Sequence, residues 1–63
     1  MIEVRIKPHP TSDKHKLVLI EWKGQVYALT YAEPFPTEKD IREVWRHERK
    51  AFRPYDTTRG FYL

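Results

Sequence analysis

The N-terminal residues alternate between apolar and charged side chains. Ile2, Val4 and Ile6 are separated by charged residues, and this period of two predicts a half-buried strand. Prolines at positions 8 and 10 are expected to end the strand, so residues 8–13 are predicted to form a polar loop.

A second strand is predicted over residues 16–22. It contains four consecutive apolar residues, Leu17–Ile20. An uninterrupted apolar run of strand length is typical of a central strand that is covered on both faces.

The pair Lys23-Gly24 predicts a hairpin into a third strand over residues 25–32. Two registers are open. A two-residue turn places Ile20 opposite Tyr27, whereas a three-residue loop with a bulge places it opposite Val26.

A helix is predicted from Glu38 to about Phe52. Thr37 is a suitable N-cap, and Asp40 occupies the position of the capping-box acid. Pro54 is expected to stop the helix. The apolar residues of this segment fall on one helical stripe, interrupted by Glu48: Ile41, Val44, Trp45, Ala51 and Phe52.

Together these elements predict one α+β domain over residues 1–63, a three-stranded antiparallel sheet packed against one C-terminal helix in the order β-β-β-α. The aromatic tail, Tyr55–Leu63, is expected either to add a short edge strand or to lie across the open face of the sheet. Most aromatic side chains must fill so small a core. Those expected to be exposed are in the tail: Tyr55, Phe61 and Tyr62.

Length and composition narrow the class of protein. A chain of 63 residues without cysteine has no disulfides to stabilise it and is unlike a secreted mini-protein. The N-terminal segment is charged, which does not fit a signal peptide, and the longest apolar run has four residues, far short of a membrane span. A soluble cytoplasmic protein is therefore expected.

Positive charge gathers toward the C-terminal end. The net charge is +3, and residues 45–63 contain five basic and two acidic residues. Arginines recur at helical spacing, at i, i+4, i+7 and i+11, and such a row can follow a phosphate backbone. The alternative is that exposed helix pairs with Glu38 and Glu43 occupy part of the row. The predicted nucleic-acid contacts are Arg42, Arg46, Arg49, Lys50 and Arg53 from the helix, with Arg5, Lys7, Lys16 and Lys23 from the sheet.

The sheet face away from the helix offers a different site. If Ile2, Val4 and Ile6 point toward the helix, charged residues surround half of the Leu17–Ile20 run on the other face. An apolar centre with a charged rim is typical of a protein-partner or homodimer surface. The alternative is that the tail covers this face.

Catalytic chemistry is not predicted. The histidines His9, His15 and His47 lack metal-ligand spacing. The chain has two glycines and neither a glycine-rich phosphate loop nor a nucleophile motif. We therefore expect no catalytic residue, no metal, no cofactor and no small-molecule substrate.

The segment from Lys16 to Arg49 resembles the arm-type DNA-binding domains of phage and transposon tyrosine-recombinase integrases. Gly24 stands at the hairpin turn, as is frequent in that family, and an aromatic-x-Thr-x-x-acid-apolar signature leads into the helix: Phe35, Thr37, Asp40, Ile41 and Trp45. The resemblance implies a three-stranded sheet packed on a C-terminal helix, and DNA as the ligand. The family's outer sheet face is basic, whereas strands two and three here offer only Lys16 and Lys23.

The sequence thus predicts a small, non-enzymatic nucleic-acid-binding module of phage or mobile-element type. The rival prediction is a protein-interaction or homodimerisation module, such as a phage- or plasmid-type accessory protein that docks on a host protein through the open sheet face.

Overall fold

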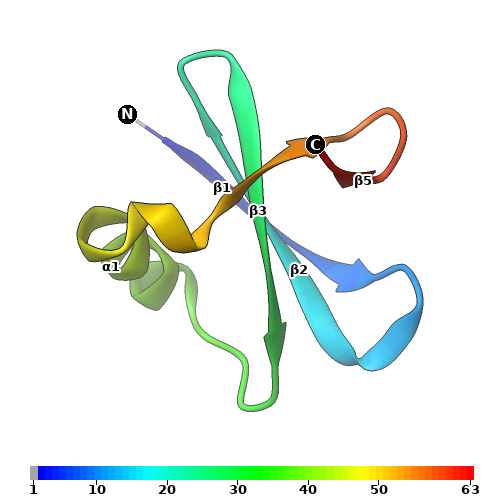
Figure 1. Ribbon diagram of the computed structural model, residues 1–63. Helices are drawn as coiled ribbons and strands as arrows, with labels where there is room; N and C mark the ends of the chain where they lie inside the picture. The colour runs from blue at the N-terminus through cyan, green and yellow to red at the C-terminus, as the bar shows by residue number, and fades with distance from the viewer. Residues whose placement is uncertain (1) are drawn as a thin grey trace.

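A computed structural model describes residues 2–63, apart from the side chain of Phe61. Five antiparallel strands follow one another in the order β1-β2-β3-β4-β5, and α1 lies between β3 and β4 in the sequence (Figure 1). The elements are β1 (Glu3–His9), β2 (Ser12–Trp22), β3 (Gln25–Ala32), α1 (Glu38–His47), the 3-10 turn η1 (Arg49–Ala51), β4 (Arg53–Asp56) and β5 (Phe61–Tyr62).

The predicted α+β class is confirmed, but the predicted count of three strands was too low. Strands β1 to β4 form one sheet, and the two-residue strand β5 pairs with β4. The additional strands are β4, which begins two residues before the predicted tail, and β5 within it, so α1 is followed by two strands rather than ending the domain. No helix among residues 2–63 is long and apolar enough to cross a membrane.

The first hairpin is tighter than expected. Strand β1 continues through Pro8, and the predicted loop over residues 8–13 shrinks to a turn at Pro10 and Thr11. Pro8 is tolerated because β1 is an edge strand, where a missing backbone donor costs no ladder hydrogen bond on the open side. The register shifts between Pro8 and His9, which accommodates the tight return.

The second hairpin takes the two-residue turn. Ile20 pairs with Tyr27, and Lys23 and Gly24 have φ angles of 51° and 79°. Two successive positive φ values are those of a type I′ turn, whose twist matches that of the flanking strands. One of the two open registers is thereby selected, and it places Tyr27 beside Ile20 on the helix face of the sheet.

The core has two layers, one on each face of β2, as the apolar run predicted. On the helix face of the sheet, Val18 and Ile20 pack with the α1 residues Ile41 and Trp45 and with Phe52. On the second face, the buried residues are Leu17, Leu19, Ala28 and Tyr55.

The tail has both roles that were left open, since it adds edge strands and also covers the second face. Tyr55 is only 8% exposed, so the expectation that it is exposed was wrong. Its ring lies 5.4 Å from that of Tyr62, which is half-buried against the same cluster. The backbone N–H of Leu63 donates to the Pro54 carbonyl and closes the β4–β5 hairpin. The same prediction for Phe61 concerns a side chain outside the described part of the chain.

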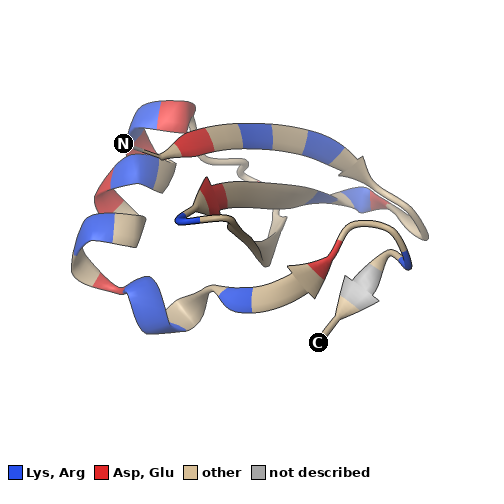
Figure 2. Cartoon of the chain, turned by 90° about the horizontal axis from the view of Figure 1, so that it is seen from above, with Lys and Arg blue, Asp and Glu red and all other residues tan. Residues whose placement is uncertain are grey.

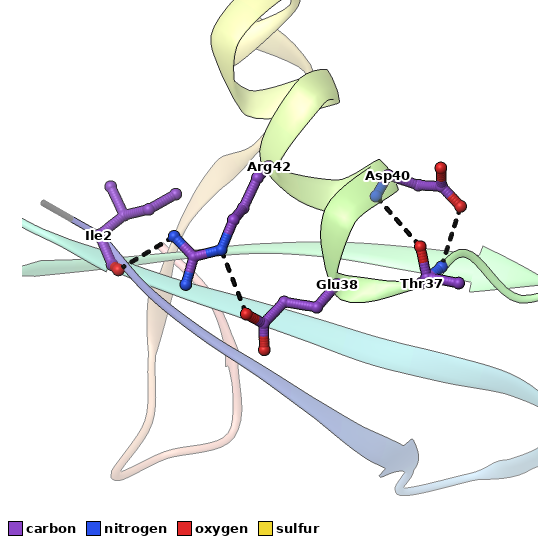
Figure 3. A network of polar contacts seen from close by, with 5 residues as sticks. All are labelled: Ile2, Thr37, Glu38, Asp40 and Arg42. Carbon is purple, nitrogen blue, oxygen red and sulfur yellow. Dashed lines mark hydrogen bonds and ion pairs between the residues drawn. The ribbon is translucent and has the colours of Figure 1, made fainter.

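Helix α1 begins as predicted. The Asp40 N–H donates to Thr37 Oγ1 at 3.2 Å, and the Thr37 N–H donates to Asp40 Oδ2 at 3.1 Å, which forms a complete capping box (Figure 3). Two of the orphan donors at the start of the helix are thus satisfied by neighbours in sequence.

The helix ends earlier than predicted, at His47 rather than about Phe52. Glu48 leaves the helical region with φ −134° and ψ 51°, and residues 49–51 form a tighter 3-10 turn. Phe52 is 4% exposed and belongs to the core, and Arg53 already starts β4. Phe52 therefore reaches the core from beyond the helix and not as part of its apolar stripe.

The capping box makes part of the stability dependent on pH. The Thr37 backbone N–H, and then its side chain, lower the pKa of Asp40 below its ordinary value of 3.8. Because the folded-state pKa is the lower one, the cap stabilises the fold above about pH 4 and this contribution is lost as the pH falls through the folded-state pKa. We expect Asp40→Asn to be less stable than the parent chain at neutral pH, with the difference shrinking toward about pH 2. Urea unfolding across this range measures it, and a difference that stays constant to the lowest pH would contradict the assignment.

Candidate nucleic-acid interface

The nine cationic residues predicted to bind nucleic acid lie on more than one side of the molecule. Figure 2 shows basic positions along α1 and, separately, along β1. Arg42 and Arg46 are on α1, Arg49 and Lys50 on η1, and Lys23 in the β2–β3 turn. Strand alternation places Arg5 and Lys7 on the second face, where they line a shallow groove with Leu19. The nine residues therefore cannot form one contact surface.

Four of the cations gather where α1 meets the β2–β3 turn, and we call Lys23, Arg42, Arg46 and Arg49 the basic cluster. A groove lined by the three arginines, Trp45 and Ile2 lies beside a second depression lined by Ile2, Lys23, Gly24 and the acidic residues Glu3 and Glu21. Ile2 borders both, so the two hollows adjoin, and the three arginines line the first while Lys23 and the two acids line the second.

The rings of Trp22 and Trp45 contact two cations of the basic cluster, Arg49 and Lys23. The Arg49 guanidinium carbon lies 4.4 Å from the ring centroid of Trp22 and 4.9 Å from that of Trp45, and Lys23 Nζ lies 4.7 Å from the Trp22 centroid. Cations at these distances from an indole are attracted by the negative face of the ring. The rings themselves are fixed edge-to-face, with centroids 5.7 Å apart.

Arg42 is held by two acceptors from different elements. Its Nε donates to Glu38 Oε2 at 3.2 Å, and its Nη1 donates to the Ile2 carbonyl at 3.4 Å (Figure 3). Its side chain is still 44% exposed. Arg42 therefore links the helix to the start of β1 and keeps donors available to a ligand.

The remaining arginines of the cluster are less engaged. Arg46 approaches Glu43 only at 4.0 Å and is 74% exposed. Arg49 makes no ion pair with any side chain in the described part of the chain. The predicted helix pairs with Glu38 and Glu43 thus exist, but exposed pairs contribute only about 0–1 kcal/mol and a phosphate can compete with them.

The predicted row of four arginines is interrupted at its end. Because α1 stops at His47, Arg53 does not follow Arg49 along a helix and lies on β4 instead. Its guanidinium carbon lies 5.4 Å from the Tyr62 ring centroid, on the second face. The expectation that Arg53 belongs to the helical row was wrong.

The other predicted residues lie apart from the basic cluster. Arg5 is paired with Glu3 at 2.9 Å, and Lys16 Nζ lies 4.7 Å from the Phe35 ring centroid at the far end of β2. Lys50 is exposed on η1. The contacts of Arg5 and Lys16 therefore lie outside the surface around Trp22, and Lys50 follows Arg49 directly in the sequence.

Trp22 belongs to the site but was not among the residues predicted to bind nucleic acid. Trp22 lies two residues after Ile20 and four after Val18 on the same strand. Strand alternation therefore indicated that its side chain faces the helix with theirs. Its contact with Arg49 depends on the end of α1, which the sequence pattern placed five residues too late.

No group of three or more histidine or acidic side chains that could hold a metal ion occurs among the residues that the structure describes. His47 Nε2 lies 3.4 Å from Glu43 Oε2, and the rings of His9 and His15 lie 6.0 Å apart at the β1–β2 turn.

No protein-family model, no curated protein and no solved structure matches this chain.

Proposed function

We propose that the chain is a small, non-enzymatic nucleic-acid-binding module that contacts its ligand through the basic cluster. The observation that supports this most directly is the convergence of four exposed cations from α1, η1 and the β2–β3 turn around the two tryptophans. The resemblance to integrase arm-type domains, and with it a phage or mobile-element origin, stays a prediction. The strands β4 and β5 are additional to the pattern of that family.

The residue types suit a polyanion. Arginine presents a planar, permanently charged fork that binds two phosphate oxygens at once, and three of the four cations are arginines. The overall charge of +3 adds a weak long-range attraction to such a ligand. Neutralising about four phosphates predicts that affinity falls on the order of a hundredfold between about 50 and 200 mM salt.

Charge reversal on the cluster tests the proposal. We expect Arg46→Glu/Arg49→Glu to weaken binding to a labelled nucleic acid by at least about a hundredfold, since two phosphate contacts are lost and two repulsions are added. Fluorescence anisotropy at low and physiological salt measures the loss of affinity. Circular dichroism checks that this double variant, and the control variant described next, are folded.

Arg5→Glu/Lys7→Glu is the matched control, because it changes the net charge by the same amount on the second face. The proposal predicts that this control keeps most of the affinity. Equal losses in both variants would mean that net charge, and not the basic cluster, governs binding.

The rival proposal is a protein-interaction or homodimerisation module that uses the second face. Leu17 and Leu19 are each 7% exposed, because Tyr55 and Tyr62 pack over the same cluster. The groove that remains beside Leu19 is lined mainly by charged residues of β1 and β2. A dimeric mass at micromolar concentration, lost on changing Arg5 and Lys7 but not Arg46 and Arg49, would favour the rival.

A further inference from the structure

We infer that the ligand of the basic cluster is the phosphate backbone of a double-stranded nucleic acid, bound with little regard to base sequence. The inference rests on the proposed function and specifies its ligand. It follows from three features of the site: the two indoles are occupied by cations, three of the four cations are held in place, and the amide side chains that read adenine are scarce.

Single-strand binders stack bases on exposed aromatic rings. Here Trp45 is 4% exposed and contacts three other rings, at centroid distances of 5.7 Å to Trp22, 5.3 Å to Tyr27 and 5.4 Å to Phe52. Trp22 is half-buried and already lies under Arg49 and Lys23. None of the aromatic side chains that the structure describes is fully exposed. At the basic cluster the two indoles therefore support cations instead of offering a free face on which a base could stack.

Three of the four cations are fixed by contacts within the protein, and Arg46 is the exposed exception. Arg49 lies against two indoles, Lys23 against one, and Arg42 is bonded to Glu38 and to the Ile2 carbonyl. A preorganised set of charges loses little side-chain entropy on binding, which suits a ligand whose own charges are regularly spaced and rigid. A duplex is such a ligand, since each strand presents a phosphate about every 3.4 Å along the axis.

Amide side chains, which read adenine, are scarce. The chain has no asparagine and one glutamine, Gln25, whose Nε2 donates to the Val26 carbonyl. The bidentate adenine contact typical of major-groove readers is therefore lacking, and the Arg49 guanidinium is already held against two indole rings. Phosphate contacts position a protein without carrying sequence information.

Four labelled ligands of equal length test the inference by anisotropy: an AT-rich and a GC-rich DNA duplex, an RNA duplex, and a single strand of oligo-dT. We expect the two DNA duplexes to bind within about threefold of each other and at least about tenfold more tightly than oligo-dT. For the DNA duplexes, the logarithm of the affinity should fall against the logarithm of salt with a slope near −4, and Arg49→Gln should reduce that slope by about one. The ratio of the affinities for the DNA and the RNA duplex identifies which of them supplies the phosphates.

Tighter binding of oligo-dT, accompanied by quenching of tryptophan fluorescence, would overturn the inference and leave the proposed function standing. A difference in affinity of more than about tenfold between the AT-rich and the GC-rich DNA duplex would also overturn it, because base readout would then be required. Absence of binding to all four ligands at low salt would refute the proposed function itself.

Discussion

Replacing Trp45 with alanine is expected to unfold most of the chain at room temperature. The side chain is 4% exposed and lies at the centre of the aromatic contacts that join α1, β2, β3 and Phe52. Removing a buried tryptophan costs about 3–5 kcal/mol. A domain of this size has only about 3–9 kcal/mol of stability to lose, at the usual value per residue.

Far-UV circular dichroism and urea unfolding measure this effect. Trp45→Phe is the control, since it retains an aromatic ring in the same place, and we expect it to stay folded at reduced stability. A Trp45→Ala variant that remained folded, with its unfolding free energy lowered by less than about 1 kcal/mol, would contradict the described helix–sheet core.

The second large effect is expected from Tyr55→Ala. Tyr55 covers Leu17, Leu19 and Ala28 on the second face, and its ring contacts that of Tyr62 edge-to-face. Its removal is expected to cost about 3 kcal/mol, by analogy with other buried aromatic truncations, and to expose an apolar strip on the central strand. We therefore expect the variant both to lose stability and to self-associate.

Sedimentation velocity and urea unfolding on the same sample separate the two outcomes. Tyr55→Phe is the matched control and should behave as the parent chain, because it keeps the ring and no hydrogen bond of the Tyr55 hydroxyl occurs among the described residues. A Tyr55→Ala variant as monomeric and stable as the parent would show that the tail does not cover the sheet.

Local signals made much of the fold predictable. The start of α1 depends on Thr37 and Asp40, three residues apart, and the central position of β2 follows from its run of apolar residues. Such features require no knowledge of distant contacts, which is why the sequence pattern located the start of α1 and the C-terminal end of β2, whereas β2 begins four residues earlier than predicted.

The features that were not predictable depend on contacts between distant segments. After the end of α1, Phe52 enters a core built from β2, and Arg53 and Pro54 pair with the edge of β3. The spacing of Arg42, Arg46 and Arg49 was visible in the sequence. Their meeting with Lys23 and Trp22 was not, because it required both the hairpin register and the true end of the helix.

The most direct test of the basic cluster as the binding surface is a two-dimensional amide NMR titration of the chain with a short DNA duplex at low salt. The proposal predicts the largest shifts at the backbone amides of the basic cluster and at the indole N–H of Trp22, with little change along β1 at Arg5 and Lys7 or in the β4–β5 hairpin. Shifts concentrated on the second face, or none at a saturating concentration of duplex, would contradict it.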